Sequence, residues 1–275
     1  MTIQTVHKGV QAGIKAKGGR AMQIISIINQ KGGVAKSTTA HAVGMGLSIM
    51  GHRVLLVDLD AQGNLSYAMK ATQGRKTAHE LLMKQATARD AIQHTEQGDL
   101  IPSSPYLTGS DTLLTMLGKE YRLKEALGSI KNYDFIIIDT PPALGVLAIN
   151  ALTASRWAIV PAQADIFSLQ GIAALYETID MVRHYCNPQL EIMGILLTRH
   201  SPRTILSRDL TEIIEQTAQR LNTRLFKTTI REAVAVREAQ ASQRDLYSYA
   251  PRSTATADYT ALVDEILERM GNNGA

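Results

Sequence analysis

Short runs of apolar, mostly β-branched residues recur along the chain and alternate with longer segments of helical spacing. The runs lie at residues 24–28, 54–57, 135–138, 157–160 and 192–197. A strand that is buried on both sides has no polar face, so such runs predict a mostly parallel sheet covered by helices on both faces. We therefore expect an α/β fold in which ligands bind at the carboxyl ends of the strands.

The segment between the second and third runs is the least regular part of the pattern. Residues 70–95 are polar and helix-prone, a short strand is expected around 99–101, and Pro102 and Pro105 indicate a turn. No low-complexity tract and no repeat with a period of about 20 to 50 residues interrupts the chain. The pattern predicts a single domain over residues 22–275, preceded by a separate tail at residues 1–21.

The composition suits one large domain with a well-buried core, because 45% of the 275 residues are hydrophobic and 20% are charged. The net charge of +4 resides in the tail, which has no acidic residue and whose basic residues are Lys8, Lys15, Lys17 and Arg20. The domain itself is balanced, so the overall charge is weak evidence for nucleic-acid binding. Three interpretations of the tail stay open: a disordered leader, a start misassigned upstream of Met22, and a basic arm that contacts an anionic partner.

The cysteine content and the absence of long apolar runs narrow the class of protein. Cys186 is the only cysteine, which excludes an intramolecular disulfide and a cysteine-based metal cage and suits a reducing compartment. No apolar run approaches the roughly 20 residues needed to span a bilayer, and the tail lacks the apolar stretch of a secretion signal. We expect a cytoplasmic protein without stable membrane insertion.

A glycine-containing loop with two lysines lies between the first predicted strand and the helix that follows it. Its sequence at residues 31–38 is K-G-G-V-A-K-S-T. Glycines let backbone N–H groups turn towards phosphates, and the start of the next helix adds a favourable dipole. Lys36 is placed to reach the β and γ phosphates, and the Ser37 hydroxyl to ligate Mg²⁺. The general pattern G-x-x-x-x-G-K-[ST] fails, because its glycines would fall on Gln30 and Ala35.

Three aspartates follow the predicted strands. Asp58 and Asp60 lie in the segment V-D-L-D-A-Q-G-N, and Asp139 ends the third run in I-D-T-P-P. Alternation along an extended chain places Asp58 and Asp60 on the same side. If their strand neighbours the phosphate loop, both carboxylates lie near the γ phosphate.

Six separated motifs, in order between about residues 22 and 270, together resemble the ParA/Soj branch of the ParA/MinD P-loop ATPases. The loop matches the deviant Walker A motif K-G-G-x-x-K-[ST], and the aspartate segments match V-D-x-D-x-Q-G-N and D-T-P-P. Further matches lie at residues 160–171, where Asp165 stands in place of the usual glutamate, and at residues 230–239 and 249–259. The resemblance implies a P-loop NTPase three-layer fold and an ATPase that uses ATP and Mg²⁺, with slow, partner-stimulated hydrolysis.

The resemblance also implies roles for individual residues. Lys31 would reach the nucleotide of the other subunit in an ATP-dependent homodimer, and Asp60 would orient the attacking water. The catalytic set is Asp60, Lys31 and Lys36, and the metal set is Ser37, Asp58 and Asp139. The ATP-binding set is Lys31, Gly32, Gly33, Val34, Ala35, Lys36, Ser37, Thr38 and Pro251. Most family members have glycine at the position of Ala35, where a positive φ would cost alanine about 1 kcal/mol.

The implied function is DNA partition, that is, chromosome or plasmid segregation. The ATP dimer would bind DNA without sequence preference, and a ParB-like centromere-binding protein would stimulate hydrolysis and release. No helix-turn-helix segment precedes the phosphate loop, so DNA contacts would come from basic residues of the dimer. The dimer would then be associated with the nucleoid. The candidate contacts are Arg199, Arg203, Arg208, Arg231 and Arg237.

Other branches and classes are separated by their own sites. The nitrogenase iron protein and the Mrp-type carriers need more than one cysteine, which excludes both. A MinD-like membrane ATPase is disfavoured because the last helix, expected at residues 258–270, carries four acidic residues against one arginine. The MinD-like alternative stays open, because the tail has apolar residues near helical spacing among its lysines. A nucleotide-gated regulatory protein with little turnover also stays open, and measured hydrolysis would distinguish it.

Overall fold

The computed structural model describes residues 22–110, 117–201 and 205–272, so the predicted basic tail at residues 1–21 lies outside the described residues. Within these ranges the chain forms an eight-stranded sheet of order β3-β4-β2-β5-β1-β6-β7-β8. The strands are β1 (Gln23–Ile27), β2 (Val54–Asp58), β3 (Gln93–Thr95), β4 (Gly98–Ile101), β5 (Phe135–Asp139), β6 (Trp157–Ala162), β7 (Glu191–His200) and β8 (Ile230–Arg231).

The pairing confirms the mostly parallel α/β sheet expected from the apolar runs. All neighbouring strands pair in parallel except β3 and β4, which form an antiparallel hairpin at one edge. The five predicted runs became β1, β2, β5, β6 and β7, with β1 between β5 and β6. Asp139 is in register with both Ile27 and Asp58, so the carboxyl ends of β1, β2 and β5 are level.

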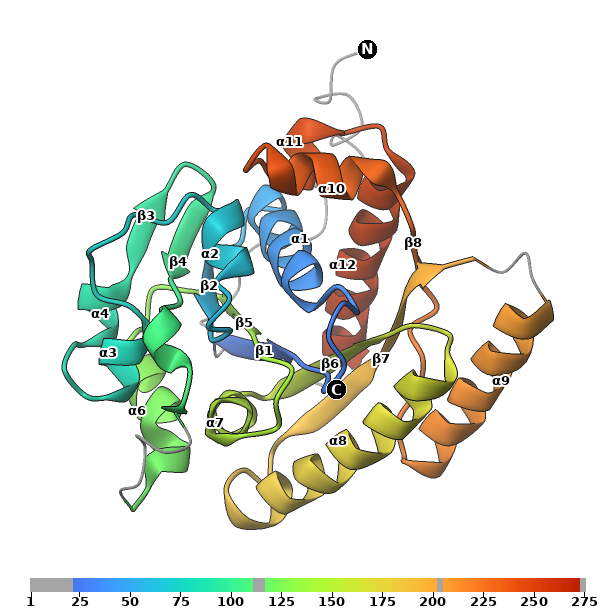
Figure 1. Cartoon of the computed structure of the whole chain (residues 1–275), viewed down its shortest axis with the longest axis horizontal. Coiled ribbons are helices and arrows are strands. Elements are labelled where there is room, and N and C mark those ends of the chain that lie inside the picture. The colour runs from blue at the N-terminus through green and yellow to red at the C-terminus, as the bar shows by residue number, and fades with distance from the viewer. Residues whose placement is uncertain (1–21, 111–116, 202–204, 273–275) are drawn as a thin grey trace.

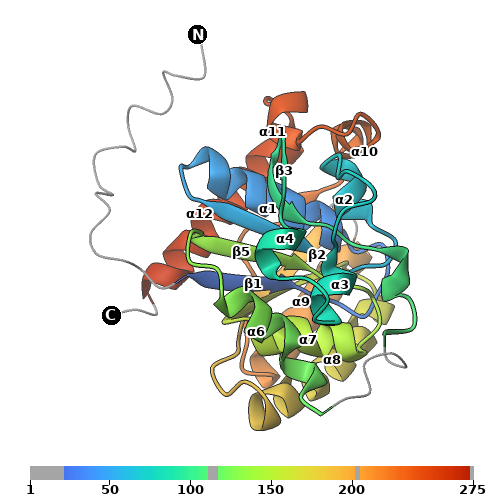
Figure 2. The ribbon, with the colours of Figure 1, turned by 90° about the vertical axis from the view of Figure 1, so that its left-hand side faces the viewer.

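Helices cover both faces of this sheet (Figures 1 and 2). Alternate residues of the central strand β5 point to opposite faces: Ile137 packs in one core cluster, and Ile136 and Ile138 in another. The helices are α1 (Lys36–Ile49), α2 (Asn64–Ala68), α3 (Ala78–Leu82), α4 (Ala88–Ala91), α6 (Arg122–Gly128), α7 (Val146–Ala154), α8 (Ile166–Tyr185), α9 (Ile205–Arg220), α10 (Val234–Ala241), α11 (Leu246–Tyr249) and α12 (Thr254–Asn272), with 3₁₀ turns η3 (Pro105–Leu107) and η4 (Lys119–Tyr121). Helices α1 and α12 lie on one face, and α6, α7 and α8 on the other.

The irregular segment at residues 70–95 folds into two short helices and the edge strand β3. Each helix begins with a capping box, in which Thr77 pairs with Glu80 and Thr87 with Asp90. Local capping compensates for helices that are too short to be stable on their own. The expected strand around 99–101 is β4, and the turn signal at Pro105 begins η3.

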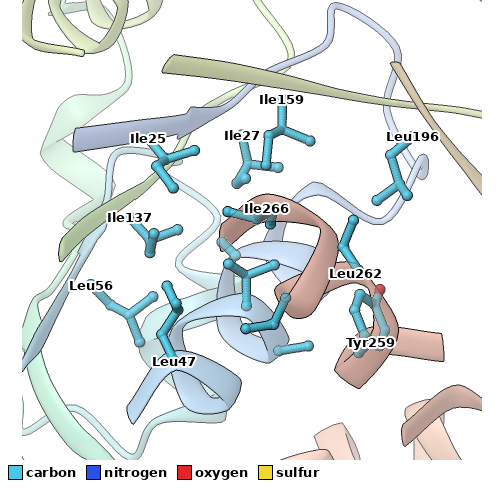
Figure 3. Close-up of a cluster of buried hydrophobic side chains, with 14 of the residues drawn as sticks. Ile25, Ile27, Leu47, Leu56, Ile137, Ile159, Leu196, Tyr259, Leu262 and Ile266 are labelled. Carbon is cyan, nitrogen blue, oxygen red and sulfur yellow. The ribbon is translucent and has the colours of Figure 1, made fainter. Parts of the chain in front are cut away.

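The last helix, α12, packs its apolar side against α1 and the sheet (Figure 3). Tyr259, Leu262, Val263 and Ile266 are fully buried there. The same face would have to be exposed for α12 to lie on a membrane surface. Among the residues that the structure describes, no helix has the length and apolar character required to cross a bilayer.

Candidate nucleotide-binding site

The loop between β1 and α1 leaves the carboxyl end of the sheet at its centre. Gly33 and Ala35 both have a positive φ, of 75° and 65°, and Ala35 directly precedes the first residue of α1. A Cβ built on Gly32 or Gly33 would meet no atom within 4 Å, so these residues line open space. Ala35 thus has the left-handed backbone conformation that favours glycine.

Polar side chains from β7 and from the residues that follow β1 and β6 hold this loop in shape. The Asn29 side chain accepts a hydrogen bond from the backbone N–H of Lys31 (3.0 Å) and donates one to the carbonyl of Pro161 (2.6 Å). The Thr198 hydroxyl lies 3.2 Å from the carbonyl oxygen of Val34, and Gln163 donates to the carbonyl of Gly33 (3.3 Å). Sequence reasoning did not single out these supports. Asn29 could have been found as a polar residue directly after an apolar run.

Lys36 projects into the same space from the first turn of α1. Its side chain is buried, and its ammonium donates to the carbonyl of Lys31 (3.1 Å). Burial lowers the pKa of Lys36, while the negative charges of Asp139 and Asp60 act in the opposite direction. The structure thus brings the predicted lysine close to Asp139 and Asp60, and the third predicted aspartate, Asp58, is in register with Asp139.

Asp139 is a buried carboxylate for which the described part of the chain supplies no hydrogen-bond donor. It is fully buried, and neither of its oxygens has a hydrogen-bond partner in the described structure. Burial raises the pKa of Asp139 well above its usual range, and the negative charge of Asp58 adds to this effect. The nearby Ser37 hydroxyl lowers the pKa, although it forms no hydrogen bond of ordinary geometry with Asp139 in the described structure. Mg²⁺ prefers oxygen ligands and often takes only one or two from the protein. The hydroxyl of Ser37 and the orphaned oxygens of Asp139 therefore fit Mg²⁺.

Asp58, in register with Asp139, has a different environment. One of its oxygens accepts a hydrogen bond from the backbone N–H of Asp60 (3.1 Å), and the other accepts two from Ser66, at 2.8 and 2.7 Å. Burial raises the pKa of Asp58 to about 6, and the hydrogen bonds from Ser66 oppose this effect. Since both oxygens already have donors, Asp58 serves to hold the loop of residues 58–66, and its metal role stays a prediction.

Asp60 lies on that loop and is 8% exposed. One of its carboxylate oxygens accepts a hydrogen bond from the backbone N–H of Gln62 (3.0 Å). Its carbonyl oxygen accepts from the N–H of Gly63 (2.8 Å), which closes a tight turn. The negative charge of Asp60 influences both Lys36 and Asp139, which places it in the same site.

Lys31 forms an ion pair with Asp165 of its own chain. Asp165 is also the N-cap of α8, since its other oxygen accepts a hydrogen bond from the N–H of Ser168 (2.9 Å). Both side chains are only partly exposed, at 27% and 31%. In this structure Lys31 is therefore held on the side of the loop where the β6–α8 connection lies.

The five predicted DNA-contacting arginines differ in their surroundings. Arg199, Arg231 and Arg237 are all exposed. Of these, Arg231 also donates to Asp258 of α12 through its backbone N–H (3.0 Å) and its Nε (2.9 Å). Arg203 lies outside the described residues, as does the side chain of Arg208, which is part of α9.

The remaining predicted nucleotide contacts involve the C-terminal segment. Thr38 accepts a hydrogen bond from the side chain of Gln240 on α10 (2.8 Å). A groove beside it lies between α1 and α10 and is lined by Thr38, His41, Ala42, Met45, Val236, Ala239, Gln240, Arg244 and Leu246. Pro251 is exposed between α11 and α12 and does not line this groove. Gln240 was not predicted, because only the fold brings α10 next to the phosphate loop.

Comparison with known proteins gives a consistent result. A family model described as an AAA domain matches residues 22–192. The sporulation initiation inhibitor protein Soj of Bacillus subtilis is 38% identical over 250 residues, covering 89% of this chain and 98% of that protein. The chromosome partitioning protein ParA of Caulobacter vibrioides is 36% identical over 256 residues, covering 90% and 95%.

Solved structures with bound nucleotides have the same fold. A cobyrinic acid a,c-diamide synthase from Mycobacterium smegmatis with ADP and magnesium has a TM-score of 0.79 at 32% identity, covering 92% of this chain and 96% of that one. A plasmid partition protein from Borrelia burgdorferi bound to AMPPNP has a TM-score of 0.74 at 26% identity, covering 92% and 99%.

Proposed function

The chain belongs to the ParA/Soj family of partition ATPases, which act on ATP with Mg²⁺, and we propose that it uses ATP to form a DNA-bound dimer and hydrolysis to release it. The observation that carries this proposal is the meeting of Lys36, Asp60 and the orphaned Asp139 at the level carboxyl ends of β1, β2 and β5. Phosphoryl transfer needs little more from a protein than placed charge and an oriented water.

Nucleotide binding rests on the loop at residues 31–38. The backbone N–H groups around Gly33 and the start of α1 face the phosphates, and the ammonium of Lys36 exchanges the carbonyl of Lys31 for phosphate oxygens. Ser37 and Asp139 would hold Mg²⁺, which would neutralise charge on the phosphates. Lys36→Ala should therefore abolish ATP binding, and unchanged affinity in a nucleotide titration would overturn the assignment of the loop.

Hydrolysis depends on Asp60, which orients the attacking water. Its carboxylate retains one oxygen without a described hydrogen bond, and its backbone is fixed on both sides. Asp60→Ala should lower turnover by a factor on the order of 10²–10⁴, the usual scale for a placed acid–base group. ATP affinity should persist, because it rests on Lys36, Ser37 and Asp139.

The dimer depends on Lys31 reaching the nucleotide of the other subunit, for which it must leave Asp165. Lys31→Ala should leave ATP binding by the monomer largely intact and remove the ATP-dependent dimer. Sedimentation of this variant as a dimer in ATP would contradict the role in trans.

DNA binding by the dimer uses phosphate contacts from exposed arginines, with Arg199 and Arg237 as the leading candidates. A membrane-bound alternative has less support. The apolar side of α12 is buried against α1 and the sheet, so it is not available to a membrane surface. A centromere-binding protein of the ParB type would stimulate hydrolysis, and the dimer would associate with the nucleoid.

Co-sedimentation with DNA in ATP, in ADP and without nucleotide tests this function, with anionic vesicles in parallel. We expect DNA binding in ATP alone, without sequence preference, and steep weakening by salt. Asp60→Ala should bind DNA at least as well and resist release. Equal binding in ADP, or binding to vesicles instead of DNA, would contradict the proposal. The same assay distinguishes a partition ATPase from a diamide synthase, which is what one structural neighbour is called. A synthase would show no ATP-dependent binding to DNA.

A further inference from the structure

The loop that carries Asp60 is tied down by a residue from a different part of the chain. Ser103 lies two residues beyond Ile101, the last residue of β4. Strands β2 and β4 are parallel, with Val57 in register with Ile101. Ser103 therefore emerges beside the carboxyl end of β2, where the loop of residues 58–66 begins.

Ser103 is hydrogen-bonded to both halves of this loop. Its hydroxyl donates to the carbonyl oxygen of Asp60. Its backbone N–H donates to the hydroxyl oxygen of Ser66 (2.9 Å), and the Ser66 hydroxyl in turn donates to Asp58 (2.7 Å). One half-buried serine thus connects the strand end, the Asp60 peptide and the start of α2.

The consequence for Asp60 follows from the short reach of its side chain. The N–H of Asp60 donates to Asp58 (3.1 Å), and its carbonyl accepts from Ser103 and from Gly63. With the peptides on both sides fixed, the direction of the Cα–Cβ bond is fixed, and only the side-chain rotations place the carboxylate. In phosphoryl transfer a displacement of about 1 Å can cost on the order of 10²-fold in rate.

We propose that Ser103 is a positioning residue for ATP hydrolysis, acting through its hydroxyl on the carbonyl of Asp60. The inference deepens the proposed function and rests on it, because Asp60 must be the water-orienting group. The β4–η3 connection, which lies outside the six motifs, would then contribute to ATP turnover. Ser103 itself contacts neither the nucleotide loop nor its lysines in any described hydrogen bond.

Replacement of Ser103 by alanine, threonine and cysteine tests this role. Ser103→Ala should lower kcat about tenfold, the rate equivalent of one net hydrogen bond, while KM and ATP affinity stay within about twofold. Ser103→Thr keeps the hydroxyl and should recover most of the rate. Ser103→Cys keeps a side chain of similar volume but with a weaker hydrogen-bond donor, so its kcat should be as low as that of Ser103→Ala. If Ser103→Ala lowers the Tm, the cysteine variant still tests the role of the hydroxyl.

Ser104→Ala is the matched control. The Ser104 hydroxyl accepts from the N–H of Tyr106 (3.2 Å) at the start of η3 and has no described contact with the Asp60 loop. This variant should lose stability comparable to the loss of a cap and keep its kcat. Equal loss of kcat in both variants, unchanged kcat in Ser103→Ala, or a threonine variant as slow as alanine would each overturn the inference.

The double variant with Asp60→Ala distinguishes the role of Ser103 from the role of Asp60. If Ser103 acts through Asp60, adding Ser103→Ala to Asp60→Ala should lower kcat no further, whereas independent effects would multiply. If Asp60→Ala hydrolyses ATP normally, the proposed role of Asp60 fails. If Asp60→Ala is inactive and Ser103→Ala is fully active, only the role of Ser103 fails.

Discussion

Ala35 and Lys31 show how single residues adjust this site. Ala35 has φ 65° and ψ 31°, a left-handed conformation that costs a residue with a Cβ roughly 1–2 kcal/mol. Lys31 is paired with Asp165 within its own chain, although its proposed partner lies on another subunit. The ion pair with Asp165 competes with the proposed role of Lys31 at the nucleotide of another subunit, whereas the strain at Ala35 lies within the phosphate loop of a single chain.

Ala35→Gly should stabilise the protein by up to about 1 kcal/mol, because relief of the left-handed strain exceeds the entropy that glycine adds to the unfolded chain. Thermal or urea unfolding measures this. Ala126→Gly, within helix α6, is the control and should destabilise by about 1 kcal/mol. Destabilisation of similar size at both positions would show that Ala35 is not strained.

Asp165→Asn should strengthen the ATP-dependent dimer about two- to fivefold, the scale of a partly exposed ion pair, because it removes the ion pair that competes for Lys31. Asparagine caps helices as well as aspartate, so α8 should keep its start. Sedimentation against protein concentration in ATP measures the effect. Asp180→Asn, which removes an exposed ion pair with Arg183 on α8, is the control and should leave the dimer unchanged. A weaker dimer in Asp165→Asn would contradict the competition.

At the scale of elements, the packing of α1 against α12 connects the phosphate loop to the C-terminal segment. Tyr259 of α12 lies within 3.3 Å of the Thr39 hydroxyl, and Tyr247 donates to the carbonyl of Ala42 (3.1 Å). Gly46 is at the close contact: a Cβ there would lie 2.5 Å from the Tyr247 hydroxyl oxygen and 2.8 Å from Val263. The helix that begins at the phosphate loop is thus positioned by the end of the chain.

Gly46→Ala should destabilise the protein by about 1–3 kcal/mol, since the added methyl group collides with a buried side chain and a hydrogen-bonded tyrosine. Gly128→Ala, on α6, is the control because a Cβ there meets nothing within 4 Å, and it should be neutral or stabilising by up to about 1 kcal/mol. Denaturant unfolding compares the two. Equal stability of both variants would show that α1 and α12 can separate at little cost.

At the scale of the whole molecule, the domain outside residues 1–21 has no net positive charge to attract DNA. The chain outside residues 1–21 carries equal numbers of acidic and basic residues, and α12 neutralises Arg231 through Asp258. The proposed non-specific DNA binding therefore depends on where exposed arginines gather in the proposed dimer.

Arg237→Ala should weaken ATP-dependent DNA binding and reduce the slope of log K against log salt by about 1, the effect of one lost phosphate contact. Arg231→Ala should change this slope less and lower the Tm more, because it removes the partner of the nearly buried Asp258. DNA-binding isotherms at several salt concentrations, with thermal unfolding, distinguish the two. The reverse ranking would place Arg231 at the DNA.

The sequence by itself determined the fold class and the position of the candidate site in the chain. Runs such as 135–138 predicted buried parallel strands because the pattern of apolar residues is a local property that burial on both faces imposes. The phosphate loop and the aspartates at strand ends could also be predicted, since parallel strands bring their carboxyl ends to one edge.

Only the tertiary structure decided how each site residue is partnered. Asp58 and Asp139 both end buried strands, yet Ser66 supplies donors to Asp58 and nothing described supplies them to Asp139. Likewise, the pairing of Lys31 with Asp165 and of Ser103 with Asp60 joins residues 134 and 43 positions apart. These contacts depend on strand order and register, which local hydrophobic patterns do not encode, and hydrogen bonds act only over about 3 Å.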